Sequence, residues 1–397
     1  MCKLSGILVA QIEGLWYNEL GSKKKRGLRQ QPPDPRKGRK MNINIIAEAG
    51  AIVNITQSKV EGVYTPEVCK TTLKVCKTAQ NHGKKGSDFD KMRNFRRQAI
   101  GVAARLRALG YTNRSIRMHQ CGSEVVYEMC PECGRTHIIS SNLCRDKICP
   151  VCGWRLSLRR FAELCTVMGR LQADLDWSQI TPQMLTLTVI NPRPADLGAC
   201  LDAMQRAQSN MLKRRTIKKT LLGWARTLEI TYNMEKRTFH PHYHYILLTH
   251  RGMEADEAEW RIRWMDALGS NYLPQCNCHE IVPRDEAEDI ELRADAIVDA
   301  VAEVAKYSIR PEALDDMPLS HLRHLVEALQ GRRMVGYAGV IKEARKGLGM
   351  IDEEALGDEE DAKQAACICG ANMALAVARW QWGEGCYRHE IITDGGA

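Results

Sequence analysis

The sequence predicts an α+β domain in which helices pack on an antiparallel sheet, and three observations support this class. An apolar, β-branched run at 184–190 ends at Asn191-Pro192, as expected for a strand. Two further strand-like runs, 223–232 and 242–249, are separated by a short turn. Helical segments lie between and after these runs, so the order is strand, helix, strand, strand, helix, strand, helix.

The remaining elements of this domain follow from spacing. The first helix covers about 198–220 and ends in a basic stretch. A second helix carries Trp260 and Trp264 at i and i+4, which favours a buried stripe over a base-stacking surface, and it leads to a short strand at 276–282. The last helix covers about 294–309, because a proline follows at position 311.

The N-terminal part of the chain is basic. The formal net charge is +9, and the first 40 residues carry ten Lys/Arg against three acids. Ala99, Ala103 and Leu106 lie at helical spacing, which predicts a helix over 90–110 that Gly110 ends. Basic clusters attract polyanions, so the charge is consistent with a nucleic-acid partner.

Composition argues against a membrane or secreted protein. The longest weakly polar run, 365–378, has 14 residues, whereas a membrane-spanning helix needs about 20 apolar residues. The N-terminus lacks the pattern of a secretory signal, because Gln11 and Glu13 follow its short apolar stretch at once. We therefore expect a cytoplasmic protein without membrane contact, in a compartment where cysteines bind metals more often than they form disulfides.

Six of the sixteen cysteines lie close together: Cys121, Cys130, Cys133, Cys144, Cys149 and Cys152. Two C-x2-C pairs, Cys130/Cys133 and Cys149/Cys152, are separated by 15 residues, which is typical of a structural zinc site. The sequence therefore predicts Zn²⁺ bound by these four thiolates, with Cys121 and Cys144 as alternates. Buried free thiols are the competing interpretation.

Three arginines follow this segment directly. Arg155, Arg159 and Arg160 lie on a predicted basic helix that begins near residue 154. Cations placed beside a zinc site can bind phosphates, so these three residues are candidate DNA contacts.

The run 239–248 predicts a metal site on a strand. His242 and His244 alternate, so they project from the same face about 7 Å apart at their backbones. Glu229 lies in the preceding strand-like run and can add a carboxylate, and His240 is a third histidine on that face. Two imidazoles and a carboxylate fit Fe(II), Zn²⁺ or Mg²⁺/Mn²⁺, and this motif alone leaves that choice open.

The predicted helix 294–309 carries Glu303, Lys306 and Tyr307. Glu303 and Tyr307 are i and i+4, which places them on one helix face about 6 Å apart. A phenol can attack phosphorus if it is oriented and deprotonated and if a metal masks the phosphate charge. Lys306 could steady the phenolate and Glu303 could activate a second nucleophile, although such a pair by itself is most often packing.

Together these motifs resemble the HUH endonuclease superfamily, and most closely the pC194/pUB110-like replication initiators of rolling-circle plasmids. The resemblance covers about residues 105–350. It is carried by the segments 143–155, 185–189, 239–248, 303–307 and 331–339.

The resemblance implies a ferredoxin-like HUH domain, preceded by a zinc-binding segment, that nicks one DNA strand at a plasmid origin. Tyr307 matches the nucleophile that becomes linked to the 5′-phosphate and leaves a 3′-hydroxyl primer. His242 and His244 match the ligands of a catalytic Mg²⁺ or Mn²⁺, Glu229 matches a strand-borne acid less closely, and Glu303 matches the carboxylate that activates water at termination. The resemblance also implies a single-stranded or hairpin nick site, with host helicase and polymerase as partners.

Three other interpretations stay open from sequence. The resemblance implies Cys121, Cys144, Cys149 and Cys152 as the expected thiols of the replication initiators. Cys130 and Cys133 instead resemble the C-x2-C of IS91-type transposases, which share HUH chemistry. A zinc-dependent DNA-binding regulator would use the histidine strand only structurally. A 2-His-1-carboxylate iron oxygenase is disfavoured by the cysteine-rich segment and by the lack of a substrate-binding signature.

The sequence divides into segments as follows: a basic, poorly defined 1–60; a mainly helical, basic 61–120; the cysteine-rich 121–160; the HUH nickase domain 180–315; a helical and basic 316–350; an acidic linker 351–364; and a C-terminal tail 365–397. In the tail, Cys367 and Cys369 could form a small metal site with Cys386 and His389. The group Cys276, Cys278 and His279 has metal-like composition, but it falls where a strand is expected.

Overall fold

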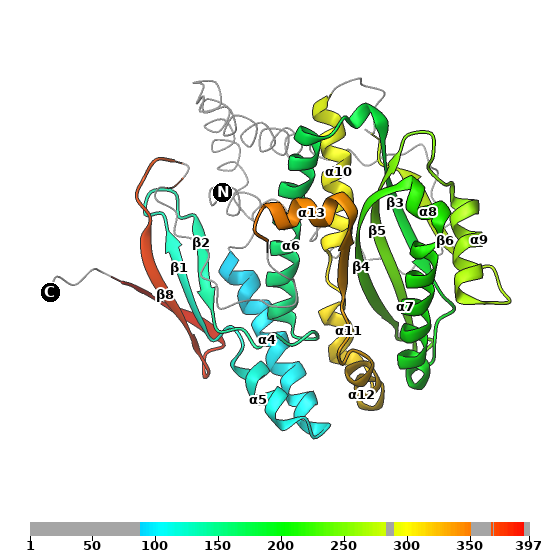
Figure 1. The fold of residues 1–397 in the computed structure, drawn as a ribbon. Helices are drawn as coiled ribbons and strands as arrows, with labels where there is room; N and C mark the ends of the chain where they lie inside the picture. Colours follow the sequence, from blue (N-terminus) through cyan, green and yellow to red (C-terminus); the bar gives the residue numbers. More distant parts are fainter. Residues whose placement is uncertain (1–87, 283–289, 351–366, 368, 393–397) are drawn as a thin grey trace, which may run out of the picture.

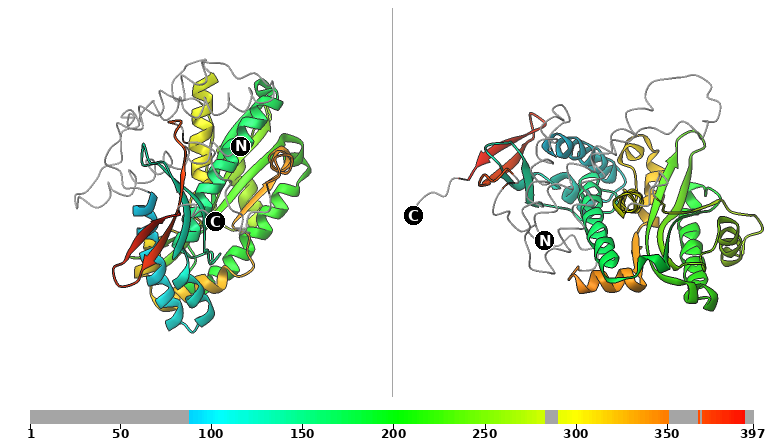
Figure 2. Two further views of the ribbon diagram at one scale, coloured as in Figure 1. Left: turned by 90° about the vertical axis from the view of Figure 1, so that its left-hand side faces the viewer. Right: turned by 90° about the horizontal axis from the view of Figure 1, so that it is seen from above.

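The computed structural model describes residues 88–282, 290–350, 367 and 369–392 (Figure 1). The predicted basic segment 1–60 and the acidic linker 351–364 lie outside the described residues. Two antiparallel sheets stand on opposite sides of a group of helices, as Figure 1 and the view from above in Figure 2 show. Within the described part of the chain, no helix is long and apolar enough to span a bilayer.

Three helices form the N-terminal part of that group: α4 (Asp88–Ala108), α5 (Thr112–Gln120) and α6 (Pro150–Asp174). The predicted helix over 90–110 is confirmed, since Ala99, Ala103 and Leu106 are buried on one side of α4. Gly110 follows with a φ of +87°, a left-handed conformation that glycine adopts without strain.

A four-stranded sheet combines the cysteine-rich segment with the C-terminal tail. It contains β1 (Glu124–Met129), β2 (Thr136–Ser141), β8 (Ala374–Gln381) and β9 (Cys386–Ile391) in the order β2-β1-β8-β9. The sequence patterns predicted no strands here and treated the two segments separately. Their pairing is long-range, with Val126 opposite Val377 and Tyr127 opposite Ala376, and no local pattern encodes it.

The second sheet confirms the predicted α+β class. Its strands are β3 (Ile180–Thr188), β4 (Leu221–Asn233), β5 (Thr238–His250), β6 (Cys276–Glu280) and β7 (Val335–Ala338), in the order β6-β3-β5-β4-β7, and all neighbours are antiparallel. The long hairpin β4–β5 forms the centre. The strand predicted around Cys276 and Cys278 is confirmed as β6, and β7 extends the edge beyond β4.

Helices cover both faces of this sheet (Figure 1). On one face α7 (Leu197–Lys213) packs against α9 (Glu257–Leu268), with the short α8 (Arg215–Thr220) following α7; the predicted single helix 198–220 is therefore interrupted at Arg214. Trp260 and Trp264 of α9 are buried, which confirms the predicted core stripe, and the Trp264 indole donates to the Thr188 carbonyl at 2.7 Å.

On the other face lies α10 (Ile290–Ala305), which contacts β4, β5 and the long α6. After α10 come α11 (Pro311–Asp316), α12 (Leu319–Ala328) and α13 (Gly339–Gly347), and α13 packs on β4 and α6.

The prediction that the last helix reaches residue 309 is wrong, because α10 ends at Ala305. The next residues are recruited by the sheet instead. The Ile230 amide of β4 donates to the Ser308 carbonyl at 2.8 Å, and Ile309 forms a parallel bridge with Ile230. Glu303 therefore lies on the helix, whereas Tyr307 lies in the connection beyond it.

Candidate active site and cysteine clusters

The register of the central strands brings a carboxylate and two imidazoles to one face of the sheet. Glu229 of β4 is directly opposite His242 of β5, and His244 is two residues further along that strand. Directly paired residues project from the same face, and so do alternate residues of one strand. This face is the one covered by α10, because His244 lies 3.7 Å from Glu303 of that helix.

The three side chains converge on one point. Glu229 Oε2 lies 3.2 Å from His242 Nε2 and 3.1 Å from His244 Nε2. The three ligand atoms all lie within 4.8 Å of one another, and all three residues are buried. The structure therefore brings together the three residues that the sequence predicts as metal ligands.

The outer ring nitrogens favour a cation at this point. His242 Nδ1 lies 3.1 Å from the His240 carbonyl oxygen, which can only accept, so the ring proton of neutral His242 lies on Nδ1. Its Nε2 faces a carboxylate oxygen of Glu229 at 3.2 Å, a geometry that either a proton on Nε2 or a cation bound between the two atoms satisfies. His244 Nδ1 is similarly placed, 3.1 Å from Thr186 Oγ1 of β3. Metal-binding histidines typically have their second nitrogen fixed in this way.

Charge at the site is balanced around Glu229. Burial alone would raise the pKa of Glu229, but hydrogen bonds from His242 and His244 hold it well below its usual range. Its second oxygen lies 3.4 Å from Nε of Arg310, a residue in the connection that follows α10. The sequence motifs identified neither Arg310 nor Thr186, because each reaches the site only through strand pairing.

His240, the third candidate, lies at the edge of this site. Its Nδ1 is 2.6 Å from Asn191 Oδ1, and burial together with the neighbouring His242 lowers the pKa of His240. It is not part of the group whose ligand atoms converge among the described residues.

The end of α10 adds a second carboxylate and a lysine. Glu303 is about one-third exposed, lies beside His244, and forms an ion pair with Lys306. Glu303 is thus a partly exposed carboxylate next to the buried metal-ligand group. This arrangement allows it to contact a molecule bound beside that group.

The Tyr307 ring packs away from the helix that was predicted to carry it. A Cβ placed on Gly153 of α6 would lie 3.3 Å from the Tyr307 ring, and the ring centroid of Phe95 of α4 is 5.8 Å away. Burial and the nearby Glu312 raise the pKa of the phenol well above its usual range, although a hydrogen bond with Ser157 opposes this. The predicted i, i+4 pairing of Tyr307 with Glu303 is wrong, since α10 ends before Tyr307.

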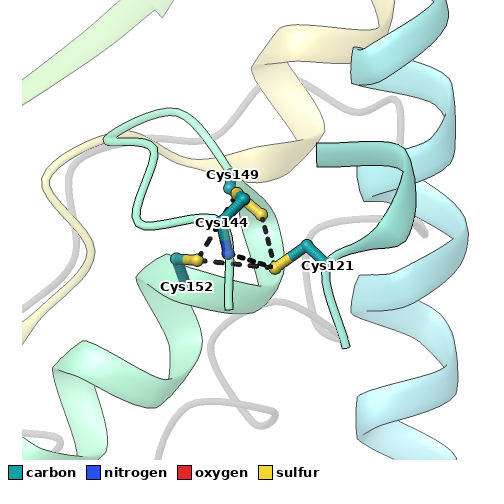
Figure 3. Close-up of side chains that lie close together, drawn as sticks. All are labelled: Cys121, Cys144, Cys149 and Cys152. Atoms are coloured by element: carbon teal, nitrogen blue, oxygen red, sulfur yellow. Dashed lines mark hydrogen bonds between the residues drawn. The ribbon is translucent and has the colours of Figure 1, made fainter. Parts of the chain in front are cut away.

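Four cysteines gather at the start of α6: Cys121, Cys144, Cys149 and Cys152 (Figure 3). All four are buried, and the Sγ–Sγ distances from Cys152 to Cys121 and Cys144 are 3.5 and 3.7 Å. Hydrogen bonds from the other three thiols hold the pKa of Cys152 far below its usual range. The Arg145 amide donates to Cys152 Sγ at 3.2 Å, and the amino-terminal end of a helix favours negative charge.

A buried arginine accompanies this cluster. Arg96 of α4 is fully buried, and its three guanidinium nitrogens have no hydrogen-bond partner among the described residues. Its Cζ lies 5.4 and 4.8 Å from the ring centroids of Trp380 and Trp382. Burial lowers the pKa of Arg96, and the Tyr387 hydroxyl and the thiols of the cluster oppose this change. A buried cation beside four cysteines fits a negatively charged metal–thiolate group, a pairing that no sequence motif indicated.

The zinc ligand set predicted from C-x2-C spacing is corrected by the structure, which brings together the four thiols that the family resemblance implies. Cys149 and Cys152 group with Cys121 and Cys144, the predicted alternates, whereas Cys130 and Cys133 lie in a second group with Cys367 and Cys369. The C-x2-C spacing identifies each pair, but folding combines the pairs with different partners.

The predicted tail site also changes. His389 Nδ1 lies 2.7 Å from the Tyr127 hydroxyl, and Cys386 lies beside Glu384, so neither joins the Cys367/Cys369 group. Cys276, Cys278 and His279 form no metal-ligand group within the described part of the chain.

The three predicted DNA-contacting arginines are placed unequally on α6. Arg160 is 4% exposed, so the structure does not present its side chain to a phosphate. Arg159 forms an ion pair with Glu163 at 2.8 Å, and Glu163 also binds Arg345 of α13. Arg155 is half-buried, and its Cζ lies 6.0 Å from the Trp154 ring centroid.

Comparison with known proteins places this arrangement in a family. The model of a family described as "Replication protein" matches residues 135–388, which include β2, the whole five-stranded sheet, β8 and the start of β9. The chain belongs to this replication protein family. The family match confirms the resemblance to plasmid replication initiators. Curated relatives agree: a "Protein rep" of Bacillus amyloliquefaciens is 29% identical over 267 residues, covering 63% of this chain and 77% of the relative.

Further relatives cover similar shares. A "Protein rep" of Streptococcus pneumoniae serotype 2 is 27% identical over 282 residues, or 68% of this chain and 83% of the relative. A "Replication protein" of Staphylococcus aureus is 27% identical over 211 residues, covering 50% of this chain and 86% of the relative. No solved structure matches the chain.

Proposed function

We propose that this protein initiates rolling-circle replication of a plasmid by nicking one strand at the double-strand origin. The observation that carries the proposal is the convergence of Glu229, His242 and His244 beside Glu303, in a chain of the replication protein family. The β–α–β–β–α–β order of β3, α7, β4, β5, α9 and β6 is the ferredoxin-like pattern on which we base the assignment to the HUH endonucleases.

Glu229, His242 and His244 would hold a divalent ion. A carboxylate with two imidazoles suits Mn²⁺ and accommodates Mg²⁺, and such an ion supplies Lewis-acid stabilisation of charge on the scissile phosphate. The His240 carbonyl and Thr186 contact the Nδ1 atoms of the two rings and would keep each Nε2 available to such an ion. The guanidinium of Arg310 partly offsets the negative charge of Glu229, and the Arg310 side chain is exposed enough to contact DNA.

Tyr307 is the proposed nucleophile. Its phenol oxygen attacks the phosphorus, the bond to the 3′ oxygen breaks, and the products are a 5′-phosphotyrosine and a free 3′-hydroxyl that primes synthesis. A buried phenol with a raised pKa is a poor nucleophile. The ring must therefore leave its position against Gly153 and Phe95 when DNA binds, and the short connection 306–310 is the segment that would move.

Glu303 is the proposed base of the second step. Its carboxylate lies next to His244 and pairs with Lys306, so it can accept a proton from a water or a 3′-hydroxyl near the metal. Attack of that oxygen on the phosphotyrosine releases Tyr307 and completes strand transfer or termination. We assign to Lys306 the role of holding Glu303 or the DNA backbone in place.

The Cys121/Cys144/Cys149/Cys152 cluster is the proposed structural zinc site of the initiator. It fixes the start of α6, the helix that Tyr307 packs against and that carries the half-buried Arg155, a proposed DNA contact. A host helicase and polymerase would extend the primer after nicking.

The proposal is tested with supercoiled plasmid that carries the DNA next to this reading frame, in Mg²⁺ or Mn²⁺. We expect nicked circles and a protein–DNA adduct whose modified peptide, identified by mass spectrometry, contains Tyr307. Tyr307→Phe should abolish the adduct. Tyr111→Phe is a matched control, because among the described residues the Tyr111 hydroxyl makes only a long, exposed contact with Glu327.

The same assay separates the alternatives. Tight DNA binding without a metal-dependent nick would support the non-catalytic regulator. Cleavage at transposon ends but not at the plasmid origin would support the transposase. An adduct that persists in Tyr307→Phe would refute the assigned nucleophile.

A further inference from the structure

The second cysteine cluster joins two parts of the chain that are far apart in sequence. Cys130 and Cys133 lie in the turn between β1 and β2, and Cys367 and Cys369 lie just before β8. The pairs that meet, Cys130 with Cys369 and Cys133 with Cys367, are 239 and 234 residues apart. The cluster therefore stands where the C-terminal hairpin meets the β1–β2 hairpin.

The sulfur positions fit one tetrahedral metal ion. Cys130 Sγ lies 3.4 Å from Cys369 Sγ, and Cys133 Sγ lies 3.5 Å from Cys367 Sγ and 3.8 Å from Cys369 Sγ. A disulfide would need about 2.05 Å. Zinc–sulfur bonds of about 2.3 Å in a tetrahedron place neighbouring sulfurs about 3.8 Å apart. The observed distances match the edges of such a tetrahedron.

A glycine in a left-handed conformation directly follows each cysteine pair. Gly134 directly follows Cys133 with a φ of +69°, and Gly370 directly follows Cys369 with a φ of +90°. Within the described part of the chain, no atom lies within 4 Å of a Cβ placed at either glycine, so turn conformation and not packing requires glycine there. Amide hydrogens of Glu132 and Cys133 also bond the Cys130 sulfur.

We propose that Cys130, Cys133, Cys367 and Cys369 bind a second structural zinc ion, which fastens the β8–β9 hairpin to the β1–β2 hairpin. Four thiolates in tetrahedral geometry select zinc or iron, and zinc is the usual ion in knuckles of this kind. The zinc ion then stabilises the four-stranded sheet β2-β1-β8-β9, in which the C-terminal strand β8 is an inner strand. The proposal is independent of the nicking reaction.

The two zinc sites should differ in how easily the ion leaves. All four cysteines of the Cys121 cluster are buried, whereas Cys133 and Cys369 are exposed. A chelator can approach the exposed sulfurs directly, so the second site should lose its ion first. Loss there would free the C-terminal hairpin while the start of α6 stays intact.

Zinc content tests the proposal in the full-length protein, purified without a histidine tag and dialysed against excess Mg²⁺. The double variant Cys133→Ser/Cys369→Ser should contain one zinc ion fewer per chain than the wild type. Cys200→Ser is the matched control, because Cys200 lies on α7 outside both clusters, and it should leave the zinc content unchanged. Unchanged zinc in the double variant would overturn the proposal, as would tightly bound iron in the wild type.

Hydrogen exchange supplies a second measurement that needs no variant. Brief treatment of the wild type with a chelator should release one zinc and raise exchange in peptides from 374–391 first. Peptides from β3 and β5 should remain protected. If the first zinc leaves without any change in 374–391, the ion does not fasten this hairpin.

Discussion

Arg96 provides a test of whether the buried Cys121 cluster carries a metal. A zinc ion with four thiolates has a net charge of −2, and such a group in a buried site needs a cation nearby. Arg96 is fully buried and has no hydrogen-bond acceptor among the described residues; burial lowers its pKa, and the cluster thiols oppose this change. We therefore assign its charge to the metal–thiolate group and predict the effect of Arg96→Met.

Whether Arg96→Met destabilises or stabilises the protein depends on whether zinc is bound. With zinc bound, the substitution removes the countercharge and the contacts with Trp380 and Trp382, which contribute about 0.5–2 kcal/mol each. Loss of an outer partner of a metal site typically weakens metal binding about 10–100-fold, or about 1.4–2.8 kcal/mol. Without zinc, Arg96 is a buried charge whose guanidinium has no hydrogen-bond partner among the described residues, so methionine should stabilise the protein.

The assay is competition for zinc with a chromophoric chelator, together with thermal unfolding with and without that chelator. Arg96→Met should lower zinc affinity about 10–100-fold. The substitution should lower the melting temperature when zinc is bound and raise it when the chelator has removed zinc. Arg97→Met, on the exposed side of α4, is the control and should do neither. Wild-type zinc affinity in Arg96→Met, or the same destabilisation with and without zinc, would refute the countercharge.

Three further predictions concern the candidate active site. Thr186→Val removes the partner of His244 Nδ1 and should weaken Mn²⁺ binding about 10–100-fold, measured by calorimetry; unchanged affinity would show that Thr186 does not orient the ring. Glu303→Gln should spare the first nick but leave the Tyr307 adduct unresolved, whereas normal turnover in a time course would contradict its role as base. The folded-state pKa of Glu229 is lowered, so its contribution to stability should be present above about pH 4.3 and decline as the pH falls toward the folded-state value. The free-energy difference between wild type and Glu229→Gln in denaturant titrations should therefore shrink at acidic pH, and a difference that grows on acidification would show the opposite sign.

The strands and the histidine motif were predictable because their signals are local. Alternation along β5 places His242 and His244 on one face without reference to the rest of the chain. The hairpin turn between β4 and β5 brings Glu229 opposite His242, so this partner was also within reach of sequence reasoning. Trp260 and Trp264 follow the same logic on a helix.

Other features depend on contacts that local patterns do not encode. The end of α10 was predicted four residues too late, because the pairing of Ser308 and Ile309 with β4 overrides the helical pattern. That difference also decides where Tyr307 lies. Arg160 carries a charge that the sequence assigned to DNA, but its position on the buried side of α6 follows from tertiary packing.

The sequence by itself determined the ligand chemistry of this protein: alternating histidines on a strand and cysteine pairs at knuckle spacing. Only the tertiary structure decided which pairs share a metal site, because Cys130 and Cys133 meet Cys367 and Cys369 across more than two hundred residues, through the pairing of β1 with β8. Residue spacing determines which side chains lie together within one strand, helix or turn. Long-range strand pairing is set by the burial and hydrogen bonding of the whole domain.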